Sequence, residues 1–299
     1  MMYIIIFLLC CIIVSLCFYI YKQNKKIISI SKQINDILFH HNDFYIQKYK
    51  EGNLSILESD ICKLVNKIYE QNHLLENEKL ILKEYLEDIS HQMKTPLTAL
   101  NLIHERLKKA EGHEKRQLLK EEKKLLDKIE WLVMSLLKMA QLDAQTVTFH
   151  QESITQKDFV LQLLNPFEIQ IDMKDIQLQI NIQESEIFKC DILWTLEAVS
   201  NILKNCIEHV EQNGIIHIEM NQNPLYDEII IQDNGCGIDQ EDLMHLFERF
   251  YKGKNAKQDS VGIGLALSSM IIEKQNGTIQ VENTYPGTKF TIHLYKENV

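Results

Sequence analysis

The chain opens with a run of 21 residues without a charged side chain, MMYIIIFLLCCIIVSLCFYIY. At about 1.5 Å per residue, a helix of this length spans roughly 30 Å, the hydrocarbon thickness of a bilayer. Lys22, Lys25 and Lys26 follow, and no charge precedes the run. We therefore predict a transmembrane helix over residues 1–21, a single pass through the cell membrane, and a cytoplasmic location for the rest. A cleaved signal peptide is the alternative, but the run lacks a basic start and a small-residue cleavage site.

The composition narrows the class of partner and cofactor. The formal net charge of −10, with no compensating basic stripe, argues against a nucleic-acid partner. The seven cysteines are scattered without a CxxC pair, which fits neither a zinc site nor a disulfide framework.

A heptad pattern predicts a long helix that associates with a second copy of itself. The seam proceeds in alternating steps of four and three residues, and its two polar members are Asn72 and Lys79. Its residues are Ile61, Val65, Ile68, Asn72, Leu75, Lys79, Leu82, Leu86, Ile89, Met93, Pro96, Leu100, Ile103 and Leu107. Such a seam favours a homodimer, and the alternative is one amphipathic helix on the protein's own core. We assign residues 22–78 to a juxtamembrane linker and signalling helix, with a break in the segment HHNDFYIQKYKEGN, residues 40–53.

A second helix is predicted after Gly112, which we expect to separate it from the first. Its apolar stripe consists of Leu119, Leu126, Ile129, Val133, Leu136 and Met139. The two helices form a hairpin, and two hairpins from two chains make a four-helix bundle. Residues 79–146 are therefore predicted to be a dimerisation domain.

Residues 147–299 have the pattern of a mixed α/β domain. Strands are expected at residues 176–182, 215–220, 227–232, 278–283 and 289–295, and helices at 191–211 and 266–275. Asp191 is a candidate cap for the first of these helices. The whole chain is thus predicted to be multidomain, with a membrane helix, a helical hairpin and an α/β sandwich.

Three motifs in the α/β domain carry candidate chemistry. In QDNGCGID, Asp233 can accept a hydrogen bond from an exocyclic amine, although DxGxG alone is also a common turn. In DSVGIGLALSS, two glycines before a helix can form an anion site, or can be plain packing. Asn201 and Asn205 share one helix face and can offer oxygen to Mg²⁺, or can be solvated amides.

The segment LFERFYKGKNAKQD lies between the two glycine motifs. Its aromatic residues can pin a loop, and Lys252, Lys254 and Lys257 can close over phosphates. The alternative is a solvated charged loop.

In this order the motifs resemble those of the sensor histidine kinases of two-component signalling. The matching boxes are SHQMKTPL, NILKNCIEH, DNGCGI, LFERFY and GIGLAL, followed by GTKF on the last hairpin. The resemblance runs from about Leu80 to Tyr295. It implies a dimeric helical phosphotransfer domain and a two-layer α/β sandwich of the GHKL (Bergerat) type. It also implies ATP and Mg²⁺ as cofactors, and a response regulator as the partner that receives the phosphoryl group on an Asp.

The resemblance also implies roles for individual residues. His91 is the expected phosphoacceptor, and Thr95 matches a position linked to water placement during dephosphorylation. Asn205 is the expected Mg²⁺ ligand. The other residues expected at the nucleotide are Asn201, Lys204, Asp233, Gly235, Gly237, Phe250, Tyr251, Lys252, Gly262, Gly264 and Leu265. Pro96, five residues after His91, removes a helical N–H group, and we expect it to let the helix bend between kinase and phosphatase arrangements.

The chain departs from the family pattern at several positions. Gln92 follows His91, where the family usually carries an acid that orients the imidazole. Glu208 stands where a phosphate-contacting lysine is frequent, and Lys204 is the stand-in. Ser260 replaces the first glycine of a longer glycine pattern.

Two other functions remain open. A GHKL-type ATPase would hydrolyse ATP with a glutamate as the base, and Glu197 precedes Asn201 by a suitable four residues. A degenerate kinase would act as a dimeric adaptor in the membrane. Because so little of the chain is expected outside the cell, a membrane sensor or transporter is a further candidate partner.

Overall fold

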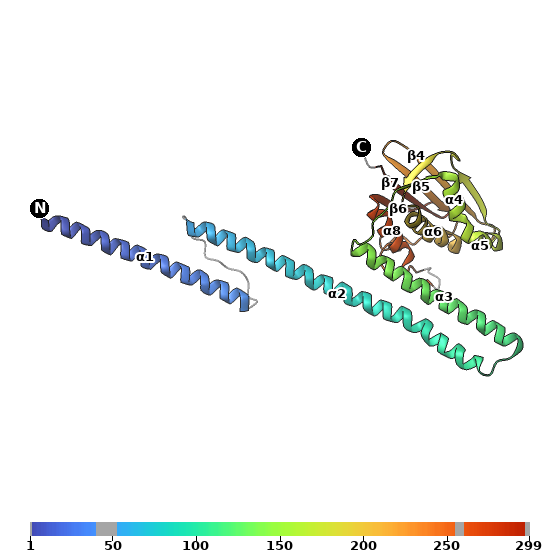
Figure 1. The fold of residues 1–299 in the computed structure, drawn as a ribbon, viewed down its shortest axis with the longest axis horizontal. Coiled ribbons are helices and arrows are strands. Elements are labelled where there is room, and N and C mark those ends of the chain that lie inside the picture. Colours follow the sequence, from blue (N-terminus) through green and yellow to red (C-terminus); the bar gives the residue numbers. More distant parts are fainter. Residues whose placement is uncertain (1, 40–52, 255–259, 297–299) are drawn as a thin grey trace. The chain divides into compact units, whose positions relative to one another are not determined.

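The computed structural model describes residues 2–39, 53–254 and 260–296. The chain divides into two compact units, Met1–Lys83 and Glu84–Val299. The described elements are helices for the first half and a mixed α/β arrangement after residue 151 (Figure 1).

The first unit consists of helix α1 (Met2–Phe39) and the beginning of helix α2 (Asn53–Leu107). Within α1, the stretch Met2–Lys25 contains an 18-residue window with a mean hydropathy of 2.9, and that window is 0% buried. By length and composition this stretch can cross a membrane. The break expected at residues 40–53 lies outside the described residues, except for Asn53, where α2 begins.

Helix α2 continues without interruption through Pro96, whose side chain is buried. Three hydroxyl groups around it bond to carbonyl groups one turn earlier: Ser90 to Leu86, Thr95 to His91 and Thr98 to Lys94. Side-chain bonds of this type bend helices slightly. The helix around His91 therefore contains a proline and three side-chain-to-carbonyl hydrogen bonds, each of which favours bending over a straight helix.

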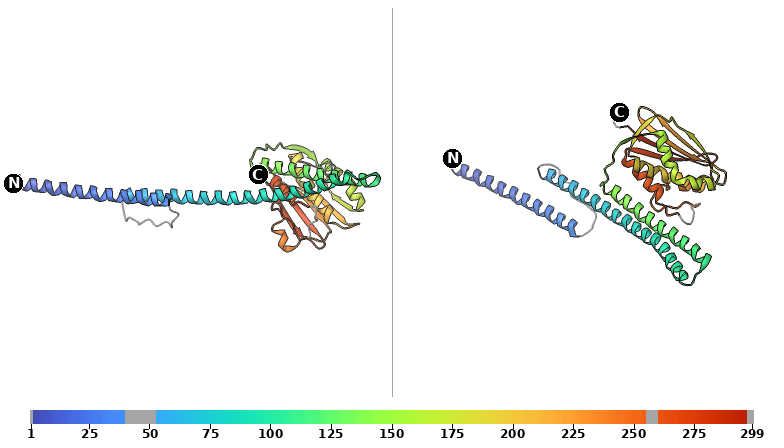
Figure 2. Two further views of the ribbon diagram at one scale, coloured as in Figure 1. Left: turned by 90° about the horizontal axis from the view of Figure 1, so that it is seen from below. Right: turned by 45° about the vertical axis from the view of Figure 1, so that its right-hand side comes forward.

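Helix α3 (Gly112–Asp143) turns back along α2, and the two form a hairpin (Figures 1 and 2). Gly112 has a φ of +56°, a left-handed conformation that suits glycine in the connector. Ile103, Ala110 and Leu118 form a small core near this turn.

The buried side of α3 differs in part from the predicted stripe. Leu118, Leu132 and Leu142 are buried, whereas Leu119, Leu126 and Val133 of the predicted stripe are exposed. The helix thus carries two apolar faces, one covered within this chain and one that leaves large aliphatic side chains in solvent.

The α/β part contains a five-stranded sheet in the order β2-β4-β5-β7-β6. Its strands are β2 (Gln177–Asn181), β4 (Ile215–Gln222), β5 (Tyr226–Asp233), β6 (Gly277–Asn283) and β7 (Thr288–Tyr295). The β2 and β4 strands are parallel, and the other neighbouring pairs are antiparallel. All five strands were predicted, with shifts of one or two residues at their ends.

Helices α6 (Ile192–His209) and α8 (Gly264–Lys274) lie between this sheet and α3 (Figures 1 and 2). The sheet's inner face and both helices supply the fully buried aliphatic core. Asp191 caps α6 by accepting a hydrogen bond from the backbone N–H of Trp194 at 3.1 Å, which confirms its predicted role.

Several short elements were not predicted. A two-stranded sheet pairs β1 (Glu152–Thr155) with β3 (Ile187–Cys190). The remaining helices are α4 (Gln156–Leu164), the 3₁₀ turn η1 (Asn165–Phe167), α5 (Glu168–Met173) and α7 (Gln240–Leu243). Elements of this length contain too few residues for a clear period in the sequence.

Candidate nucleotide-binding site

Within the unit Glu84–Val299, a cavity of about 1020 Å³ lies against α6, the end of β5 and the start of α8. Ten residues expected at a nucleotide line it: Asn201, Lys204, Asn205, Asp233, Gly237, Tyr251, Lys252, Gly262, Gly264 and Leu265. Of the other expected nucleotide residues, Gly235 and Phe250 do not line the cavity. The fold therefore brings together motifs that are more than 60 residues apart in the sequence, such as Asn201 and Gly264.

Asp233 lines the cavity and is only 5% exposed. Its Oδ1 accepts hydrogen bonds from the backbone N–H groups of Gly235 (2.8 Å) and Thr288 (3.4 Å). Because both donors use the same oxygen, they fix the orientation of the carboxylate. Burial raises the pKa of Asp233, and these N–H groups together with the Cys206 thiol act in the opposite direction.

Gly235 lies too close to α6 for any larger residue. A Cβ atom at this position would lie 2.8 Å from the carbonyl oxygen of His209. Gly235 thus allows the close backbone packing that orients Asp233, and it does not itself line the cavity.

Other residues that line the cavity offer groups suited to phosphate. The Asn201 Nδ2 atom is buried and has no hydrogen-bond partner among the described residues. Gly264 begins α8 beside Asn201, and Gly262 has a φ of +77°. The free N–H groups at the beginning of α8 and the Asn201 amide are donors that an anionic oxygen would satisfy.

Two lysines, Lys204 and Lys252, also line the cavity. Lys204 lies over the ring of Trp131, 5.2 Å from its centroid. The Nζ atom of Lys252 donates to Gln92 Oε1 at 3.5 Å, and burial and the positive charge of Lys128 lower the pKa of Lys252. An anion near these cations would reduce their mutual repulsion.

The expected phosphoacceptor region lies beside the cavity, not in its wall. His91 and Thr95 are exposed on α2, and neither lines the cavity. Gln92, the next residue after His91, is the one in hydrogen-bond contact with a cavity residue, Lys252. Lys257 lies outside the described residues.

Contacts between the hairpin and the α/β part were missed by the sequence analysis. Arg249 Nη2 lies 2.8 Å from both carboxylate oxygens of Asp143. Its guanidinium also lies 5.1 Å from the centroid of the Tyr85 ring, and Phe250 packs against the same ring. Phe250 therefore belongs to this contact. The cavity is also lined by residues that were not predicted at the nucleotide, among them Leu246 of the α/β part and Trp131 of the hairpin.

Comparisons with known proteins agree with this geometry. The family "Histidine kinase-, DNA gyrase B-, and HSP90-like ATPase" matches residues 190–298. Sensor histidine kinase YclK of Bacillus subtilis is 25% identical over 283 residues, which cover 90% of this chain and 58% of YclK. Heme sensor protein HssS of Staphylococcus haemolyticus is 27% identical over 277 residues, covering 91% and 59% of the two chains. The chain thus spans less than two thirds of the length of these relatives.

Solved structures show the same fold. Histidine kinase AdeS of Acinetobacter baumannii has a TM-score of 0.58 at 24% identity, covering 70% of this chain and 98% of that one. Histidine kinase ThkA, in its complex with response regulator protein TrrA, has a TM-score of 0.61 at 20% identity. This match covers 77% of this chain and 66% of that one.

The fold and cavity therefore define an ATP-binding domain of the histidine kinase-, gyrase- and HSP90-like class. With the apolar N-terminal helix and the long helical region before that domain, the chain is similar over about 90% of its length to sensor histidine kinases.

An asparagine at position 233 tests the predicted contact of Asp233 with adenine. In Asp233→Asn, the two backbone N–H groups will keep the amide oxygen at the Oδ1 position, so an NH₂ donor will replace Oδ2. We expect affinity for ATP to fall about 100-fold, because adenine also presents a donor, and affinity for ITP to fall less. Isothermal titration with both nucleotides measures the ratio. Equal losses for ATP and ITP would contradict the assigned role.

Proposed function

We propose that this chain is a membrane-anchored, homodimeric sensor histidine kinase. It transfers the γ-phosphoryl group of ATP to His91, and then to an aspartate of a response regulator. The observation that carries the proposal is the contact between Lys252 and Gln92. A residue that lines the nucleotide cavity there meets the neighbour of an exposed histidine.

The chain's own residues supply positioning and charge. The phosphates are bound by Asn201, by Gly262 and Gly264 at the start of α8 and by the two lysines. Asp233 binds the adenine amine. Asn205 offers a side-chain oxygen in the cavity wall for Mg²⁺, a ligand type that this ion prefers. When bound, Mg²⁺ would neutralise charge on the phosphate oxygens. A neutral imidazole nitrogen of His91 attacks the γ-phosphorus, so that an N–P bond forms, the bond to the bridging oxygen breaks, and ADP leaves.

The position of Glu197 favours a kinase over an ATP hydrolase. Its Oε1 atom lies 3.0 Å from Lys138 Nζ of α3, and Glu197 does not line the cavity. The residue that lines the cavity one turn later is Asn201, which cannot take a proton from water. The position from which a glutamate would activate water in a hydrolase is therefore held by an amide, which favours transfer of the phosphoryl group to the histidine.

The exposed face of α3 supports a homodimer. Leu119, Leu126 and Val133 are 47%, 52% and 37% exposed on a helix that already has a covered face. The same face of a second hairpin is the natural cover, as in a four-helix bundle. Helix α1 anchors the dimer by a single crossing, with the α/β domain in the cytoplasm, and a membrane sensor or transporter is a candidate source of the stimulus. ThkA is described with a response regulator, and we extend that kind of partner to this chain.

A phosphorylation assay tests the function. The purified full-length protein in lipid nanodiscs is incubated with Mg²⁺ and ATP labelled at the γ-phosphate. We expect label on the protein that is lost in acid and kept in base, as for phosphohistidine, and that moves to a response regulator when one is added. Steady release of free phosphate without labelled protein would favour the hydrolase. Nucleotide binding without either product would favour the adaptor.

A further inference from the structure

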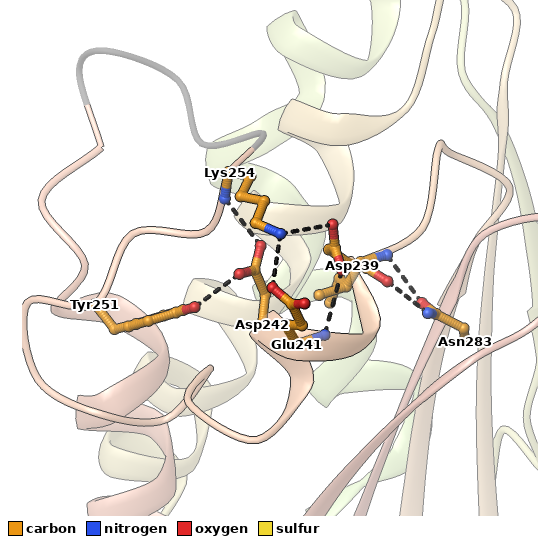
Figure 3. Close-up of polar contacts among 7 residues, drawn as sticks. Asp239, Glu241, Asp242, Tyr251, Lys254 and Asn283 are labelled. Carbon is orange, nitrogen blue, oxygen red and sulfur yellow. Dashed lines mark hydrogen bonds and ion pairs between the residues drawn. The ribbon is translucent and has the colours of Figure 1, made fainter.

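Asp242, in the short helix α7, accepts two hydrogen bonds from the segment that follows this helix. Its side chain is 4% exposed. Oδ1 accepts a hydrogen bond from the Tyr251 hydroxyl at 2.7 Å, and Oδ2 accepts one from the backbone N–H of Lys254 at 2.8 Å (Figure 3). These donors lower the pKa of Asp242, so it is ionised at neutral pH. One carboxylate thus holds two points of the segment that follows α7.

Lys252 lies between these two points. Gly253, on its other side, passes directly over the carboxylate, where a Cβ atom would lie 2.7 Å from Asp242 Oδ2. Tyr251, Lys252 and Gly253 all line the cavity. The chain is therefore held to Asp242 before and after Lys252, by the Tyr251 hydroxyl and by the backbone N–H of Lys254, which limits the directions that the lysine side chain can take.

The segment that leads into α7 is hydrogen-bonded to strand β6 of the sheet. The Asn283 amide at the end of β6 donates to the carbonyl of Ile238 at 2.6 Å and accepts from its N–H at 2.9 Å. Ile238 precedes α7 by two residues. Figure 3 shows this path from Asn283 through α7 to Tyr251 and Lys254.

Lys254 has a different environment from Lys252. Its Nζ atom lies 2.8 Å from Glu241 and 3.5 Å from Asp239, and it does not line the cavity. Of these two lysines, Lys252 is the one directed to the nucleotide cavity.

We infer that Asp242 is a positioning residue that holds Lys252 toward the phosphates of a bound nucleotide. The inference rests on the proposed nucleotide site, and deepens it by naming the group that orders the segment over the phosphates. Asp242 acts through Lys252 and is not assigned any contact with the nucleotide.

A direct electrostatic effect of Asp242 would have the opposite sign. The carboxylate also borders the cavity, so removing its charge would reduce repulsion of an anionic ligand and strengthen ATP binding. If Asp242 positions Lys252, removing the charge will weaken ATP binding. The sign of the change therefore separates the two explanations.

The test compares Asp242→Asn, Lys252→Ala and the double variant in the full-length protein. Affinities for Mg-ATP and for adenosine, which lacks phosphates, are measured by competition with a fluorescent ATP analogue. We expect Asp242→Asn to weaken the binding of Mg-ATP about tenfold and the binding of adenosine less than twofold. The loss of a hydrogen bond to a charged group costs a free energy that corresponds to about a tenfold change in affinity. In the Lys252→Ala background, the same change is expected to have no further effect on Mg-ATP.

Glu241→Gln is the matched control, because Glu241 pairs with Lys254 Nζ but does not line the cavity. Glu241→Gln should leave the affinities for Mg-ATP and for adenosine within twofold of the wild-type values. Tyr251→Phe, which removes one of the two hydrogen bonds, should give an intermediate loss for Mg-ATP.

Three results would overturn the inference: tighter Mg-ATP binding by Asp242→Asn, equal losses for Mg-ATP and adenosine, or additive losses in the double variant. Thermal unfolding of each variant shows whether it is folded. If Asp242→Asn is unfolded, Tyr251→Phe carries the same comparison. Failure of the wild-type protein to bind Mg-ATP would instead contradict the proposed function, so the two failures are distinguishable.

Discussion

Replacing His91 with alanine will abolish incorporation of acid-labile phosphate, by more than about 1000-fold, and will leave affinity for Mg-ATP within twofold. The first effect is expected because alanine offers no nucleophile for the γ-phosphorus. The second is expected because His91 is exposed and lies outside the cavity wall. Exposed substitutions of this kind change stability by about 0.5 kcal/mol or less, so the variant should remain folded.

His104→Ala is the matched control for this prediction. His104 is exposed on the same helix, thirteen residues further on, and does not line the cavity. It should incorporate phosphate like the wild type. Labelling that survives in His91→Ala, or that disappears in His104→Ala, would place the phosphoacceptor elsewhere.

Much of the fold could be predicted because several signals are local. Residue alternation predicted all five strands of the main sheet, and Asp191 stands directly before the helix that it caps. The glycine motifs and the asparagine pair each have a fixed spacing, so their order in the chain was informative before their meeting in one cavity was known.

The contacts that hold the site were not predictable from spacing. Arg249 and Asp143 are 106 residues apart, and nothing in LFERFY indicates that its arginine bonds to α3 while its phenylalanine packs on α2. Asp242 lies in a four-residue helix, where no period can form. Its neighbours Asp239 and Glu241 are acids too, and only burial and hydrogen-bond partners distinguish Asp242 from them.

The choice of helix face in α3 failed for a different physical reason. Adjacent leucines, Leu118 with Leu119 and Leu125 with Leu126, allow two stripes one position apart. In this chain Leu118 is buried and Leu119 is exposed. A helix that packs on its own chain and on a second copy needs both stripes, so periodicity could not assign one of them to the intramolecular core.

Alanine at position 287 is expected to be the most destabilising single change near the site. Gly287 has a φ of +98°, and a Cβ atom there would lie 1.9 Å from the backbone oxygen of Asp233. Either the β6–β7 turn or the end of β5 must move, and the backbone conformation is strained in addition. We expect a loss of about 4 kcal/mol in the free energy of unfolding, seen as a fall of roughly 10 °C in the melting temperature of the α/β domain.

Gly112→Ala separates steric overlap from backbone strain. Gly112 also has a positive φ, of +56°, but no atom lies within 4 Å of the position that a Cβ would take. It should therefore lose only about 1 kcal/mol, the cost of the left-handed conformation. Because the overlap at Gly287 is with the residue that we assign to adenine, Gly287→Ala should also weaken ATP binding, whereas Gly112→Ala should not. Similar losses of stability in the two variants would show that the turn at Gly287 can relax, and that its closeness to Asp233 does not determine the geometry of the base site.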